Sequence, residues 1–157
     1  MNNIFSLYFI FLLLPYAPID SKEDQQAVLQ SVFNIEEFQN YLAYSPRFVS
    51  TNSKQEVLMV GFPELESRDM ELTVREKSIK IISENVINEL ELNFFIKIDE
   101  FDINRSSAKV LLSYQNARMY FEKEQKILLD AQLEKTSEGE WIVKNYNLYE
   151  VSTNTSD

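Results

Sequence analysis

The sequence predicts an α+β protein in which an N-terminal helical segment packs on one face of a curved antiparallel β-sheet. Apolar residues recur at helical spacing between residues 21 and 44, and they alternate with polar residues through much of the stretch from 56 to 151. The 157 residues are 45% hydrophobic and 25% charged, which is typical of one globular domain that needs no disulfide. We expect a leader at residues 1–17, a single domain at 18–151 and a flexible tail at 152–157.

The predicted leader rests on an apolar run at the start of the chain. Residues 4–14 read IFSLYFIFLLL, in which only Ser6 is polar. A bilayer-spanning helix needs about 20 residues, so this run fits the core of a secretory signal peptide better. Residues 15–17 would supply the cleavage region. We therefore expect export to the periplasm or the extracellular space; the alternatives are an uncleaved membrane tether and a buried N-terminal element.

The predicted helical segment begins after the leader. Ser21 is the expected cap, and Asp24 stands where a capping box has Glu or Gln. Residues 34–37 repeat a cap signal, so the run to about Tyr44 forms either one kinked helix or two short ones. Pro46 ends it. The apolar stripe that we expect to face the core consists of Val28, Leu29, Val32, Phe33, Phe38, Tyr41 and Leu42.

Strands are predicted along the remaining domain, joined by polar connections. The segments with strand patterns are residues 56–61, 70–74, 78–82, 92–101, 108–115, 127–135 and 140–151. The connections at 75–77 and 136–139 predict hairpins, and residues 84–91 predict a short helix capped by Ser83. Residues 117–125 contain strong helix formers but could also edge a long bent strand. We favour the strand.

The last two predicted hairpins resemble those of a known group of folds. The form LEK…GEWIV over residues 133–143 is similar to the last hairpin of NTF2-like and cystatin-like domains, and residues 101–110 resemble their penultimate hairpin. The layout over residues 92–151 also resembles small exported Bacteroidota proteins of unknown function. The resemblance implies a cone-shaped or meander sheet. Enzymes of the NTF2-like family place Tyr and Asp side chains inside the cone. Tyr114 and Asp130 are the nearest matches, but alternation places Tyr114 in the core and Asp130 on the wet face.

Composition argues against several kinds of function. The formal charge of −10 repels nucleic acid and anionic lipid, so we expect no nucleic-acid partner and no membrane contact beyond the leader. The chain has no cysteine and no histidine, which removes the usual zinc ligands and the usual general base. Two glycines cannot build a glycine-rich phosphate loop. We therefore expect no catalytic residue, metal or cofactor.

One cluster of carboxylates follows a predicted strand. Asp99, Glu100 and Asp102 surround Phe101, and strict alternation would place Glu100 and Asp102 on one face with Asp99 on the other. Paired carboxylates act as acid and base only when their environments push the two pKa values apart. We interpret the cluster as a polar strand end.

Aromatic residues gather near the C-terminus and supply the candidate ligand-binding residues. Trp141, Tyr146 and Tyr149 lie on the last predicted strand, and aromatic side chains commonly line pockets and protein interfaces. Trp141 alternates with Val143, which favours core packing. We take Tyr114, Trp141 and Tyr146 as the candidate ligand contacts.

These observations favour a non-enzymatic exported binding or interaction domain, which would use its concave sheet face or an edge strand. Its partner would be an unknown protein or a small-molecule ligand. A narrower form is an acidic inhibitor or immunity-type protein that neutralises a basic partner. The alternatives are an NTF2-like isomerase or hydrolase acting on a small apolar substrate and a membrane-tethered structural domain.

Overall fold

The computed structural model describes most of the predicted domain. The described residues are 21–44, 56–62, 65, 69–90, 94–122 and 126–151. The predicted leader and the predicted tail lie outside these ranges. No helix within them is both long enough and apolar enough to cross a membrane.

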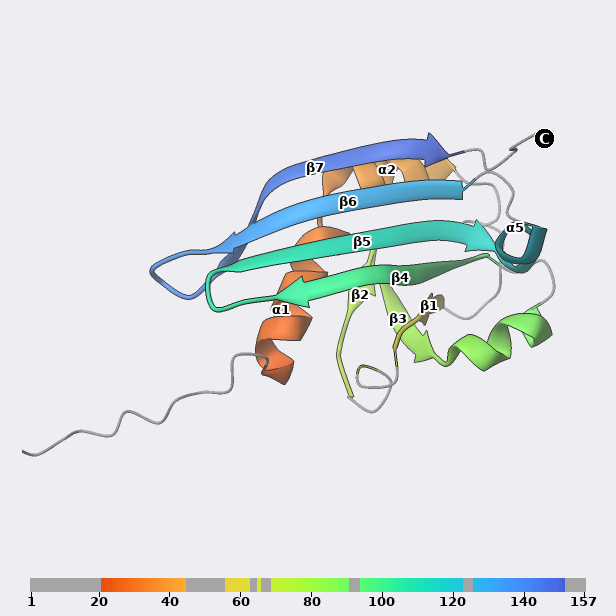
Figure 1. The fold of residues 1–157 in the computed structure, drawn as a ribbon, viewed down its shortest axis with the longest axis horizontal. Helices are drawn as coiled ribbons and strands as arrows, with labels where there is room; N and C mark the ends of the chain where they lie inside the picture. The colour runs from red at the N-terminus through yellow and green to blue at the C-terminus, as the bar shows by residue number, and fades with distance from the viewer. Residues whose placement is uncertain are drawn as a thin grey trace, which may run out of the picture.

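The described chain forms an α+β fold built on a curled, half-barrel sheet (Figure 1). Seven strands within the described ranges follow the order β2-β3-β1-β4-β5-β6-β7. Helices α1 and α2 cover one face of this sheet, which we call the inner face, and the opposite face is called the outer face (Figure 1). The predicted class, with an N-terminal helical segment packed on a curved sheet, is confirmed.

Two short helices form the predicted helical segment. Helix α1 spans Lys22–Phe33, and Ser21 caps it because its Oγ accepts the N–H of Asp24 at 3.1 Å. Helix α2 spans Glu36–Tyr44 and begins after the chain turns at Asn34. Six residues of the predicted stripe are buried against the sheet: Val28, Leu29, Val32, Phe33, Phe38 and Leu42. Tyr41 is 37% exposed, so its predicted place in the core is wrong. Of the two alternatives, the pair of helices is therefore the correct one.

The last four strands form the antiparallel meander that the alternation predicts. They are β4 (Phe94–Ile103), β5 (Ser107–Asn116), β6 (Lys126–Lys135) and β7 (Trp141–Val151). Every second side chain faces the helices and enters the main core. The inner-face residues of β4 to β6 include Ile96, Ile98, Val110, Leu112, Tyr114, Ile127, Leu129, Ala131 and Leu133. These side chains belong to the same core cluster as the apolar stripes of α1 and α2.

The sheet is mixed, so the prediction of a purely antiparallel sheet is wrong. Strand β1 (Glu56–Val60) lies between β3 (Lys77–Ile82) and β4 and runs parallel to both. Met59 and Val60 are both buried although they point to opposite faces. A strand buried on both faces has a continuous apolar sequence, and such a run carries no information about the direction of its neighbours.

Strand β2 (Thr73–Val74) pairs antiparallel with β3, which confirms the predicted hairpin, although β2 is shorter than the expected 70–74. The two residues of its turn are Arg75 and Glu76, with φ of 48° and 63°. Two-residue hairpins with two positive φ values usually carry Asn-Gly. This turn is therefore made without glycine, at some cost in backbone strain.

The strand favoured for residues 117–125 is wrong where the structure describes it, because Ala117–Glu122 forms helix α5. Asn116 starts this helix, since its side-chain oxygen accepts the N–H of Met119 at 2.8 Å, a helix-capping contact. Arg118 and Glu122 add an ion pair one turn apart, at 2.8 Å. Residues 123–125 lie outside the described ranges.

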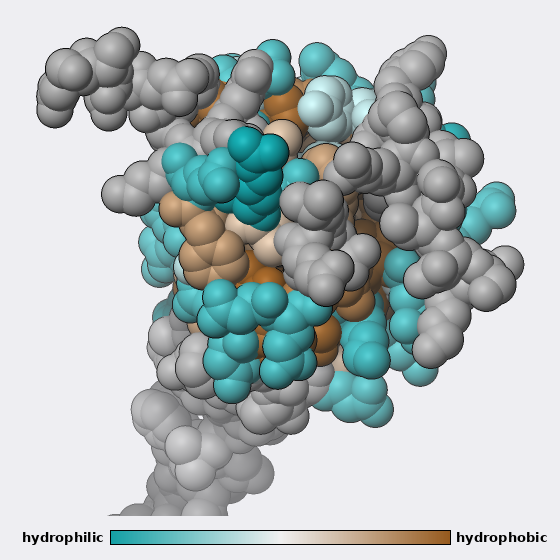
Figure 2. Space-filling view, turned by 90° about the vertical axis from the view of Figure 1, so that its right-hand side faces the viewer, coloured by the Kyte–Doolittle hydropathy of each residue, from teal (hydrophilic) through white to brown (hydrophobic). Residues whose placement is uncertain are grey.

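The predicted short helix at 84–91 is a 3₁₀ helix, η1 (Glu84–Leu90). It packs with α5 over a second apolar cluster, which consists of Val60, Ile87, Leu90, Phe95 and Ala117. Figure 2 views the molecule from the end where α5 lies and shows hydrophobic side chains surrounded by hydrophilic ones. The two short helices thus cover one end of the outer face.

Candidate functional site

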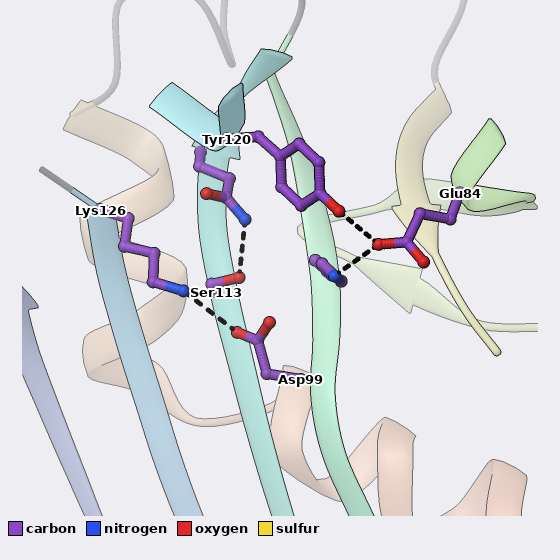
Figure 3. Close-up of polar contacts among 7 residues, drawn as sticks. Glu84, Asp99, Ser113, Tyr120 and Lys126 are labelled. Carbon is purple, nitrogen blue, oxygen red and sulfur yellow. Dashed lines mark hydrogen bonds and ion pairs between the residues drawn. The ribbon is translucent and has the colours of Figure 1, made fainter. Parts of the chain in front are cut away.

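Polar side chains form a network on the outer face where η1, α5 and β4 meet (Figure 3). Lys97 Nζ lies 2.7 Å from Glu84 Oε1, and the Tyr120 hydroxyl donates a hydrogen bond to the same oxygen. The Lys97 ammonium also lies 4.8 Å from the centroid of the Tyr120 ring. These three residues, the Glu84 network, connect two short helices to the central sheet.

The electrostatics of the Glu84 network favour a structural role over proton transfer. Hydrogen bonds from Lys97 and Tyr120 lower the pKa of Glu84. Burial would lower the pKa of Lys97, but the hydrogen bond to Glu84 and the nearby Tyr120, Glu84 and Asp99 charges together outweigh it, and the pKa is raised. The hydrogen bond to Glu84, together with burial, raises the pKa of Tyr120. Each group keeps its ordinary charge at neutral pH, whereas a general acid or base works best with a pKa near the operating pH.

A β-bulge changes the expected positions of the carboxylates on β4. The pairing with β5 shifts register between Ile98 and Glu100, so Asp99 is an extra residue. Asp99 Oδ2 lies 3.7 Å from Lys126 Nζ (Figure 3). Glu100 accepts a hydrogen bond from Lys109 at 2.8 Å. Both lysines belong to the outer face. The prediction that Asp99 faces away from Glu100 is therefore wrong, and each of the two carboxylates has a lysine partner.

Two buried polar residues adjoin this region. Ser113 is 0% exposed and Gln115 is 2% exposed, and the Gln115 amide donates to Ser113 Oγ at 3.0 Å (Figure 3). An activated serine needs a neighbouring base that removes its proton. An amide donor cannot do so, so this hydrogen bond does not activate Ser113.

A second candidate site is a groove of about 370 Å³ beside the last strand. One wall comes from the junction of α1 and α2, and the other comes from β7. The lining residues are Ser31, Asn34, Ile35, Glu36, Val143, Lys144, Asn145 and Tyr146. We call this feature the β7 groove.

Local contacts explain why the β7 groove forms. Ser31 Oγ donates to the backbone oxygen of Trp141 at 2.9 Å, which fixes α1 against the start of β7. The helix then ends and the chain turns into α2. On the opposite wall, Leu133 pairs with Val143 while Gln132 pairs with Asn145, so Lys144 is the extra residue of a second bulge. The groove opens where the helix turns and the strand bends.

The charged groups at the β7 groove are mostly carboxylates. The nearby Glu37 carboxylate raises the pKa of Tyr146. Glu36 lines the groove itself. Lys144 Nζ lies 3.1 Å from Glu134 Oε2, which offsets its positive charge. The site therefore suits a ligand that brings positive charge or hydrogen-bond donors.

The three candidate ligand contacts have different environments. Tyr114 is 4% exposed in the core, where its ring stacks on Phe94 at a centroid distance of 5.2 Å. Trp141 is 6% exposed, so its predicted core packing is confirmed, and its Nε1 donates to Asp24 Oδ1 at 2.9 Å. Tyr146 is 37% exposed and lines the β7 groove. The structure does not bring these three residues together in one pocket.

The residues implied by the NTF2-like resemblance do not share a site. Tyr114 faces the helices from β5, whereas Asp130 of β6 pairs with Leu111 on the outer face, as alternation predicts. Sequence reasoning missed both the β7 groove and the Glu84 network. The cap signal at residues 34–37 could have indicated the turn that forms one groove wall. No local sequence signal links Tyr120 to Glu84. Comparisons with protein-family models, curated proteins and solved structures found no match.

Proposed function

We propose that this chain is an exported, non-enzymatic binding domain that receives its partner in the β7 groove and along the adjoining sheet edge. The proposal rests on β7, which is a long edge strand with exposed apolar side chains. It is an edge strand of 11 residues, and within the described ranges it pairs with β6. Three of its large apolar side chains are exposed: Ile142 by 43%, Tyr146 by 37% and Tyr149 by 43%. Exposed aromatic residues of this kind are enriched in protein interfaces.

The alternative of an NTF2-like isomerase or hydrolase has less support. Such an enzyme would need an open cavity on the inner face, but Tyr114 there is packed among core side chains. The titratable groups of the Glu84 network keep their ordinary charges at neutral pH. We propose only that the architecture resembles NTF2-like or cystatin-like domains. This rests on the four-stranded meander with helices on its inner face.

Export is the second part of the proposal and is supported by the apolar run at residues 4–14. The test is the intact mass of the protein isolated from the medium or the cell envelope of its own host. Loss of the first 17 residues is the expected result. A mature chain that retains Met1 would favour the membrane tether instead.

The binding role is tested by site-specific crosslinking in the host cell. A photo-reactive amino acid replaces Tyr149, and the matched control replaces Phe121, an exposed aromatic residue of α5 (53% exposed). We expect a discrete crosslinked species from position 149 and none from position 121. The proposal fails if the two positions give the same products, or if position 149 gives none.

A further inference from the structure

We infer that the partner is an extended segment of another protein that carries Lys or Arg and pairs with β7 as an additional strand. This inference rests on the proposed function and specifies the chemistry of its partner. It is based on the backbone of β7, on the side chains beside it and on the charge of the surrounding surface.

The backbone of β7 offers hydrogen-bonding groups along one side. An edge strand directs alternate N–H and C=O groups away from its sheet. The side chain of Ser31 in α1 already donates a hydrogen bond to the carbonyl of Trp141. The bulge at Lys144 interrupts the regular pairing of β7 with β6. The stretch that follows, residues 145–151, has regular antiparallel register with β6. An added strand would therefore pair along these seven residues.

This stretch lacks the features that normally protect an edge strand. Natural edges are blunted by proline, by lysine, by short length or by bulges. Residues 145–151 read NYNLYEV and contain no proline, lysine or arginine. The opposite edge strand, β2, spans only Thr73–Val74 and is too short to dock a partner in this way. Of the two edges that the described strands form, only β7 combines length with a sequence free of proline, lysine and arginine over residues 145–151.

The side chains beside β7 indicate a basic partner. An added strand would place alternate side chains against Tyr149 on the outer face and against the β7 groove on the inner side. Glu36 lines that groove, and the Glu37 carboxylate is close enough to raise the pKa of Tyr146, another lining residue. An arginine or lysine directed into the groove would contact these carboxylates. The net charge of −10 would also speed the approach of a basic segment.

The same charge disfavours a second copy as the occupant. Two chains that each carry −10 repel one another, and the groove carboxylates would meet the equivalent carboxylates of the other copy. A small molecule could enter the groove, but it would leave the edge backbone and Tyr149 uncovered. An extended basic segment covers the groove and the edge together.

The test uses a synthetic peptide of alternating Val and Thr with a central Arg, long enough to span residues 145–151. N-methylation along one edge keeps the peptide from pairing with itself. Binding is followed by ¹⁵N amide shifts and by amide hydrogen exchange of the protein. We expect slower exchange within residues 145–151. Changing the peptide Arg to Glu should weaken binding about tenfold, the value of one charge-assisted contact.

Two controls isolate the strand-addition mode. A peptide N-methylated on both edges should lose binding, because it cannot donate to β7. Among protein variants, Tyr149→Ala should weaken binding and Phe121→Ala should leave it unchanged. Equal binding of the doubly methylated peptide would overturn strand addition. Absence of peptide binding, with the crosslink at position 149 retained, would overturn this inference and leave the proposed function standing. A dimer that Tyr149→Ala abolishes would assign the edge to a second copy and also overturn it.

Discussion

Replacing Asp24 with alanine should destabilise the fold more than its place near a helix end suggests. Asp24 lies in the first turn of α1, and its Oδ1 accepts hydrogen bonds from Lys135 Nζ at 2.5 Å and from Trp141 Nε1 at 2.9 Å. One carboxylate therefore ties the start of α1 to both strands of the last hairpin. Figure 1 shows α1 passing behind the sheet.

The magnitude follows from what the substitution leaves behind. Trp141 is 6% exposed, so an unsatisfied indole N–H costs about 1–3 kcal/mol. The ion pair with Lys135, whose side chain is 26% exposed, adds at most about 1 kcal/mol. We expect Asp24→Ala to reduce the free energy of unfolding by about 2–3 kcal/mol.

The assay is equilibrium unfolding in urea, followed by fluorescence of Trp141, the only tryptophan of the chain. With a slope of about 2 kcal/mol/M, the midpoint should fall by about 1 M. The matched control is Glu23→Ala, which removes an exposed carboxylate from the same helical turn and should cost about 0.3–1 kcal/mol. Equal midpoint shifts for the two variants would refute the argument.

The same contact makes a prediction about pH. Burial would raise the pKa of Asp24, but hydrogen bonds from Lys135 and Trp141 outweigh burial and lower it. A carboxyl with a lowered folded-state pKa stabilises the protein above its unfolded pKa, and this contribution is lost as pH falls through the folded value. The difference in unfolding free energy between the native chain and Asp24→Asn should therefore shrink between about pH 5 and about pH 2. A constant difference across this range would contradict the assignment.

Three further substitutions test other parts of the structure by the same urea assay. Tyr120→Phe removes the bond to Glu84 and should cost about 1 kcal/mol; no change would argue against the network as a tether. Glu76→Gly relieves a φ of 63° and should stabilise the fold by about 0.5–1 kcal/mol. Gly139→Ala should cost about 1–2 kcal/mol because φ there is 91°, although space around the Cβ is open. If these two turn substitutions change stability in the same direction, the strain argument is wrong.

Much of the meander could be predicted because one face of each strand is buried and the other is wet. That asymmetry appears in the sequence as alternation, so Val110, Leu112 and Leu129 identify both the strands and the face that meets the helices. It also places Trp141 in the core. The cap at Ser21 was predictable for a similar reason, since capping uses a side chain within the same turn.

The errors arise where one residue or one distant contact decides the outcome. The extra residue Asp99 reverses the facing of the strand that precedes it, and no local pattern marks the bulge. Residues 117–122 suit a helix or a strand, and the side chain of Asn116 makes the difference by capping α5. The direction of β1 depends on partners that its apolar sequence does not specify.

The β7 groove depends on both local sequence signals and distant contacts. Each wall forms for a local reason, but the two walls are far apart in sequence. Ser31 and Trp141 are 110 residues apart, and their partly buried hydrogen bond fixes helix α1 against strand β7. Tyr146, whose pKa is raised by the nearby Glu37 carboxylate, is 37% exposed on the β7 wall. Water can replace an exposed hydrogen bond at little cost, whereas a buried donor or acceptor must keep its partner. A ligand could therefore contact the exposed Tyr146 while the Ser31 hydrogen bond keeps helix and strand together, so binding at the groove would not loosen the core.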